Sequence, residues 1–136
     1  MPKFSQQSLS QLSSCDLDLQ KLFFEVIKYF DCKVLEGYRN EMDQEKAFQA
    51  GNTKLHYPHG KHNHKPSLAV DVAPYPINWS NTKRFYYFGG FVLGVAKKLK
   101  EEGKMTHGIR WGGDWDGDNI IDDQTFMDLV HFELIV

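Results

Sequence analysis

The stretch SLAVDVAPY, residues 67–75, is an apolar run with one acidic residue inside it. A short apolar run of this kind is typical of a buried strand. A carboxylate within it is costly to bury unless it is paired or bound to a metal ion. Because side chains alternate along a strand, we expect Val70 and Val72 to face the core and Asp71 to face a cleft.

Helical and extended patterns surround this strand without a regular βαβ repeat. Apolar residues at helical spacing predict a helix over 16–30. Helices over 42–50 and 83–102 are predicted from the glycines that follow them and, for the second, from a capping Ser80 or Asn81. Shorter apolar patterns predict further strands over 32–38, 107–111 and 131–136. The sequence therefore predicts an α+β fold, in which a small, mostly antiparallel sheet has helices packed against it and carries a cleft with the functional site.

The whole chain has 136 residues and is expected to form one domain, 1–136, that acts as a monomer. Its apolar share of 41% and charged share of 25% suit a domain with a real core. A net charge of −2 gives no electrostatic support for a nucleic-acid partner. Cys15 and Cys32 lack CxxC spacing, so we expect two buried, reduced thiols.

The first segment, MPKFSQQSLSQLSS, is polar and has no apolar region of the kind found in secretory signals. No stretch of the sequence approaches the roughly 18 apolar residues that a membrane span requires. The sequence therefore predicts a protein that is made in a cytoplasm, is not inserted in a membrane, and needs another system to release it if it acts elsewhere.

A long polar loop over 51–66 precedes the strand and holds four of the six histidines. His64 lies seven residues before Asp71, and a loop of this length can fold back so that both side chains bind one ion. Spacing alone does not choose it over the other histidines of the loop, which are His56, His59 and His62.

The C-terminal segment offers further ligands and a base. His131 and Glu133 share one face of the last predicted strand, and Asp128 lies three residues before His131. Two imidazoles and one carboxylate can form a zinc site with an open position for water. Asp128 or Glu133 could then accept the proton of a water molecule activated by zinc. The competing interpretation is structural, with surface histidines and a strand aspartate paired with an arginine.

Five motifs occur in a fixed order along the chain, namely GYR at 37–39, HKPSLAVD at 64–71, GGDW at 112–115, DLVH at 128–131 and HFELIV at 131–136. In this order they resemble the zinc peptidases that include D-Ala-D-Ala carboxypeptidases, D-Ala-D-Ala dipeptidases and phage L-alanyl-D-glutamate endopeptidases. The likeness covers most of the chain and is strongest to the short, single-domain phage endolysins.

The family spacing selects His64, Asp71 and His131 as the zinc ligands. The sequence departs from the family near the first of these. Many members have Ser two residues before the first zinc histidine, where this chain has His62, and Gly three residues after it, where this chain has Ser67.

The resemblance also implies roles for residues around the zinc ion. It implies that Asp128 is the base and that Arg39 stabilises negative charge on the attacked carbonyl. Gln44 follows Arg39 by five residues, as in the family. Gln44 and Glu133 are expected to support the site or to contact substrate.

The function implied by the resemblance is hydrolysis of the L-Ala–D-Glu bond in the peptidoglycan stem peptide by a phage endolysin. Such a protein reaches the wall after holin-type release. One alternative is a carboxypeptidase or dipeptidase that acts on D-Ala-D-Ala with the same zinc site. The other is a non-catalytic zinc module that binds wall peptide or a protein, which has no need of Asp128 or Arg39.

The acidic segment over 114–123 is a candidate calcium site. Asp114, Asp116, Asp118 and Asp122 occupy the first, third, fifth and ninth positions of an EF-hand-like loop. The motif is incomplete, because its Gly and its last Glu are replaced by Asn119 and Thr125. The alternative is a solvated acidic loop.

Overall fold

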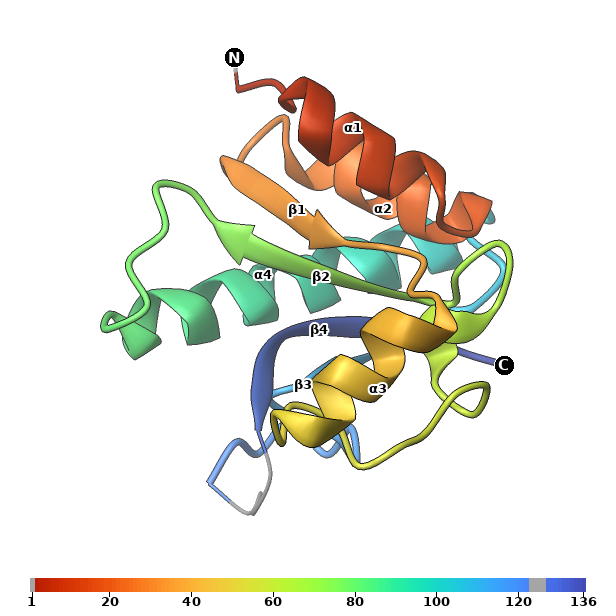
Figure 1. Cartoon of the computed structure of the whole chain (residues 1–136). Coiled ribbons are helices and arrows are strands. Elements are labelled where there is room, and N and C mark those ends of the chain that lie inside the picture. Colours follow the sequence, from red (N-terminus) through yellow and green to blue (C-terminus); the bar gives the residue numbers. More distant parts are fainter. Residues whose placement is uncertain (1, 123–126) are drawn as a thin grey trace.

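The computed structural model describes residues 2–122 and 127–136, which form an α+β fold around one antiparallel sheet (Figure 1). The elements are α1 (Gln6–Ser13), α2 (Leu17–Val26), β1 (Cys32–Glu36), α3 (Glu41–Gln49), η1 (Lys61–Asn63), β2 (Ala69–Pro74), α4 (Thr82–Glu101), β3 (Gly108–Gly112) and β4 (Asp128–Ile135). The sheet order is β1-β2-β4-β3, and each neighbouring pair is antiparallel. The predicted fold class is confirmed. Within the described part of the chain, no helix is long and apolar enough to cross a membrane.

Alternation along β2 directs its one acidic side chain away from the core. Val70 and Val72 are fully buried in the hydrophobic core, whereas the Asp71 side chain keeps 15% of its surface exposed. Asp71 lies directly opposite His131 in the pairing of β2 with β4. Because directly opposite residues project to the same face of a sheet, both side chains lie on the face away from the core.

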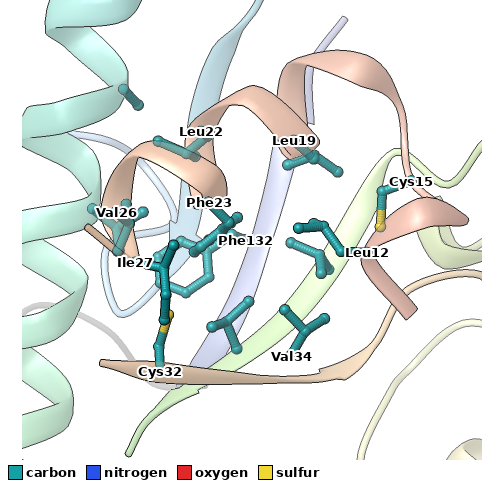
Figure 2. Packing of buried hydrophobic residues seen from close by; sticks show 14 of the residues in the cluster. Leu12, Cys15, Leu19, Leu22, Phe23, Val26, Ile27, Cys32, Val34 and Phe132 are labelled. Carbon is teal, nitrogen blue, oxygen red and sulfur yellow. The ribbon is translucent and has the colours of Figure 1, made fainter. Parts of the chain in front are cut away.

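Helices α2 and α4 cover the core face of the sheet, and Figure 1 shows α4 crossing behind β2 and β4. Phe23 of α2 meets Phe132 of β4 edge to face, with ring centroids 5.4 Å apart (Figure 2). Cys15 and Cys32 are buried and free, as predicted. Burial raises the pKa of each thiol to about 12, so both stay protonated and unreactive.

The sequence does not predict α1, because residues 6–13 are polar and lack a clear apolar stripe. In the structure the polar side chains of this helix take the place of a neighbouring strand beside β1. The Ser8 hydroxyl accepts a hydrogen bond from the Val34 N–H, and the Gln11 amide oxygen accepts one from the Gly37 N–H. Because an open strand edge invites pairing with other chains, this helix protects the sheet.

Strand β4 begins at Asp128, three residues earlier than the predicted strand. Its register against β3 shifts between the Trp111–Phe132 and Gly112–Asp128 pairs, so extra residues of β4 bulge out. In a regular strand, residues three apart face opposite sides, whereas a bulge re-aims the side chains around it. The bulge thus allows Asp128 and His131 to line the same hollow.

Candidate active site

Three side chains from separate elements converge on the cleft face of the sheet, namely His62 of η1, Asp71 of β2 and His131 of β4. The Nε2 atom of His62 lies 3.2 Å from Oδ1 of Asp71, and Nδ1 of His131 lies 3.3 Å from the same oxygen. All three donor atoms lie within 4.8 Å of one another. Two imidazole nitrogens and one carboxylate oxygen are a donor set that suits zinc.

The second nitrogen of each ring has its own partner. Nδ1 of His62 lies 2.7 Å from the carbonyl oxygen of Gly37, and Nε2 of His131 lies 2.8 Å from a carboxylate oxygen of Glu133. Metal-binding histidines usually hold their second nitrogen in this way, which fixes the ring orientation. The arrangement leaves Nε2 of His62 and Nδ1 of His131 directed at the shared point beside Asp71.

Electrostatic attraction within the group is strong. Burial alone would lower the pKa of His131, but hydrogen bonds to Asp71 and Glu133 raise it to about 9. Burial would raise the pKa of Asp71, but His62 and His131 hold it well below its usual range. Asp71 is therefore ionised at neutral pH, as a metal ligand must be.

His64 does not join this group, although the seven-residue spacing to Asp71 predicts it as a ligand. Its side chain is exposed, and His62 takes its place beside Asp71 and His131. The ligand role of His64 stays a prediction from the sequence, and the geometry offers His62 as an alternative. Helix η1 ends just before His64, where the backbone becomes extended, so the His62 and His64 side chains are placed differently.

Asn63 holds η1 so that the preceding histidine faces inward. Its amide nitrogen donates to the carbonyl of Arg39, and its amide oxygen accepts from the N–H of Gly60. The backbone N–H of Arg39 in turn donates to the carbonyl of His62 at 2.8 Å. These bonds tie the histidine loop to the chain that leaves β1. The other two loop histidines, His56 and His59, are exposed.

Arg39 lies beside Asp71, where the resemblance places it. One terminal nitrogen of its guanidinium is 3.7 Å from Oδ2 of Asp71. Glu36 accepts hydrogen bonds from two guanidinium nitrogens at 2.9 and 2.5 Å, and Gln44 accepts a third at 3.1 Å. Gln44 is 1% exposed and also donates to the carbonyl of Leu55. Glu36 is not among the residues predicted from the sequence; its signal there is its position directly before the GYR motif.

Asp128 lies at the edge of the same cleft. Together with His62 and His131 it lines a hollow of about 370 Å³. Burial, followed by the negative charge of Asp71, raises the pKa of the Asp128 carboxyl above its ordinary value. A carboxyl with a raised pKa is suited to accept a proton and return it.

Glu133 is engaged differently from Asp128. Besides His131, it pairs with Lys61 at 3.2 Å and Arg110 at 3.4 Å. Burial alone would raise the pKa of Glu133, but His131 and Lys61 lower it. A carboxylate held by three partners is poorly placed to take a proton from water, and well placed to orient His131.

The acidic loop brings together three of the four predicted calcium ligands, namely Asp114, Asp116 and Asp118. Asp114 is 4% exposed; its Oδ2 accepts from the N–H of Asn119, but its buried Oδ1 has no hydrogen-bond partner among the described residues. Asp122 is exposed and outside this group, and Thr125 lies outside the described residues.

Asp16, Asp18 and His107 form a further cluster of possible metal ligands. Hydrogen bonds of Asp18 account for this cluster without a metal ion. Oδ2 of Asp18 accepts from the backbone N–H groups of Thr106 and His107 and pairs with Nδ1 of His107, each at 2.9 Å. Burial alone would raise the pKa of Asp18, but these bonds lower it. Asp18 therefore fastens the start of α2 to the chain before β3.

Two histidines and an aspartate that meet on one face of a sheet, with an arginine and a second acid beside them, are typical of metallopeptidases. Comparison with known proteins gives the particular family. The family model for phage L-alanyl-D-glutamate peptidases matches residues 1–135, and the chain belongs to this family. The resemblance stated from the motifs is thus confirmed.

The fold is also found in a solved structure, the L-Ala D-Glu endopeptidase ChiX from Serratia marcescens. The two structures superpose with a TM-score of 0.73 at 22% sequence identity, over 98% of this chain and 90% of that one. At this identity the likeness shows a shared fold. Among curated protein sequences no match was found.

Proposed function

We propose that this protein hydrolyses the L-Ala–D-Glu bond of the peptidoglycan stem peptide with a zinc ion held by His62, Asp71 and His131. The observation that carries the proposal is the convergence of the three donor atoms within 4.8 Å. The membership in a family of phage L-alanyl-D-glutamate peptidases supports the choice of bond. When bound, zinc supplies Lewis-acid chemistry, because it polarises a carbonyl and lowers the pKa of water.

The surrounding residues carry the proton and the developing charge. Asp128, with its raised pKa, accepts a proton from the attacking water and passes it to the leaving amine. Arg39 stabilises the negative charge that develops on the carbonyl oxygen, because its guanidinium is held in place by Glu36 and Gln44. Glu133 orients His131 through the 2.8 Å hydrogen bond.

A digest of purified muropeptides tests the proposed reaction. We expect mass spectrometry to show products cut between L-Ala and D-Glu, and we expect a chelator to abolish the cleavage and added zinc to restore it. Release of free D-Ala would instead identify the carboxypeptidase or dipeptidase. Binding of wall peptide without any cleavage would identify a non-catalytic module.

We further propose that the acidic loop binds Ca²⁺ through Asp114, Asp116 and Asp118. The buried, unpartnered Oδ1 of Asp114 supports this, because a bound cation would satisfy it. Asp122 is left out of the ligand set. Calorimetry with zinc-loaded protein should show heat on addition of Ca²⁺ and none for Asp114→Ala. An equal response of both proteins would contradict the site.

The cellular setting is proposed from the phage family. We propose that residues 1–136 act as one catalytic domain and as a monomer, and that a holin-type system gives the protein access to the peptidoglycan. Light scattering should then give the mass of one chain, 15.8 kDa. Lysis of intact host cells should require co-expression of a pore-forming partner, whereas lysis of cells with opened membranes should not.

A further inference from the structure

Trp79 is a large aromatic side chain that is 61% exposed beside the proposed base. Together with Met127 and Asp128 it lines a hollow of about 180 Å³ and a second hollow of about 480 Å³. The second hollow extends to Arg39 and Asp71. The exposed indole therefore forms a wall of the cleft that is continuous with the reacting groups.

The indole of Trp79 is held in a fixed position. It stacks on the buried ring of Phe85, with centroids 5.4 Å apart and an interplanar angle of 18°. The segment before it is fastened to α4, because the Arg84 guanidinium donates to the carbonyls of Pro76 and Tyr75 at 2.9 and 3.0 Å. A rigid aromatic surface binds a ligand at a low cost in conformational entropy.

The two ends of the cleft differ in charge. At the Trp79 end, the guanidinium of Arg39 is paired with Glu36, and the remaining ionisable groups of the hollow are the two aspartates. The neighbouring hollow of about 370 Å³, which also contains Arg39 and Asp128, adds the cations Lys54 and Lys61 and one further acid, Glu133, which pairs with Lys61 at 3.2 Å. Its lining is therefore less negative than that of the hollow beside Trp79. An anionic group is therefore favoured at the lysine end, and an uncharged group at the aromatic end.

The proposed substrate has a matching asymmetry. On the amino side of the scissile bond, L-Ala is joined by an amide to the lactyl group of a muramoyl sugar, and this part carries no charge. On the carboxyl side, D-Glu and the next residue carry free carboxylates. Carbon–hydrogen faces of a sugar pack well on an aromatic ring, and carboxylates bind lysine side chains.

We propose that Trp79 and Met127 form the subsite for the muramoyl–L-Ala part of the substrate, and that the end with Lys54 and Lys61 receives the D-Glu carboxylate. The inference rests on the proposed function and adds to it the direction in which the stem peptide lies. It also makes the sugar, and not the peptide alone, part of what the cleft recognises.

Product binding tests the subsite independently of catalysis. The probes are N-acetylmuramoyl-L-alanine, its sugar-free counterpart N-acetyl-L-alanine, and the dipeptide γ-D-glutamyl-diaminopimelate, each titrated calorimetrically into zinc-loaded protein. The variants are Trp79→Ala and, as a matched control, Tyr87→Ala. Tyr87 is an aromatic residue of α4 that is 73% exposed and lines none of the cleft hollows.

We expect Trp79→Ala to weaken binding of N-acetylmuramoyl-L-alanine about tenfold, which is the scale of one well-packed aromatic contact. Binding of the other two probes should change less than about twofold, and Tyr87→Ala should change none of the three. Unchanged binding of the sugar probe to Trp79→Ala, or equal weakening of all three, would overturn the subsite. A muropeptide digest without cleavage at L-Ala–D-Glu would instead refute the proposed reaction, whatever the products bind.

Discussion

The choice between His62 and His64 as metal ligand can be tested with a matched pair of substitutions in one loop. His62→Ala removes one of three converging donors, whereas His64→Ala removes an exposed side chain. Changes to residues that merely support a metal ligand cost about 10- to 100-fold in affinity. We therefore expect His62→Ala to weaken zinc binding by at least about 100-fold, or about 2.7 kcal/mol.

The His62 substitution also breaks the 2.7 Å hydrogen bond to the carbonyl of Gly37. Leaving that buried group unsatisfied should lower the free energy of unfolding by about 1–3 kcal/mol. The assay is competition for zinc against a chromophoric chelator, with circular dichroism to show that each variant is folded. His64→Ala should match the unmodified protein within about twofold. A large loss of zinc affinity in His64→Ala, with near-normal affinity in His62→Ala, would refute the assignment.

Three further predictions concern catalysis and stability. Asp128→Asn should retain zinc in the same competition assay, while its cleavage rate should fall about 10²–10⁴-fold. A loss of zinc affinity as large as that of His62→Ala would show that Asp128 is a ligand and not a base. Asp18→Ala should lower the free energy of unfolding in urea by about 2–4 kcal/mol, because three hydrogen bonds to a charged group are lost. Because the folded-state pKa of Asp18 is lowered, this contribution is present above about pH 4 and fades as the pH falls further, so the effect of the substitution should shrink in acid. Gly89→Ala should be destabilising by about 1–3 kcal/mol, because the added methyl group would overlap the ring of Trp111. Gly94 faces open space, so Gly94→Ala should stabilise α4 by about 0.5–1 kcal/mol. Similar shifts of the melting temperature in both variants would contradict this packing.

The fold was largely predictable because its sheet obeys local rules. The apolar run around Asp71 and the capping signals at the two ends of α4 predict elements that the structure confirms. Helix α1 was not predictable in the same way. This helix stabilises the fold through side-chain hydrogen bonds to Val34 of β1 and to Gly37 just after it, each 26 residues further along the chain. No local sequence pattern indicates such contacts.

The candidate site was predictable to a lesser degree. Strand alternation predicts that Asp71 and His131 face one cleft, and the pairing of β2 with β4 agrees. His64 was predicted from its spacing to Asp71, and spacing along the chain does not say which way a side chain points. Only the fold of η1 decides which histidine points inward. The sequence departs from the family pattern at residues 62 and 67, close to the two histidines between which the choice lies.

Helix α1 has a consequence for the metal centre. The Gln11 side chain and the Ser14 hydroxyl hold the N–H groups of Gly37 and Tyr38, and the carbonyl of that same glycine accepts from the His62 ring. The N-terminal helix thus supports the carbonyl that holds the ring of a proposed metal ligand. If His62 binds the metal as proposed, fraying of this helix would loosen the ring, and the first residues of the chain would influence metal affinity from a distance.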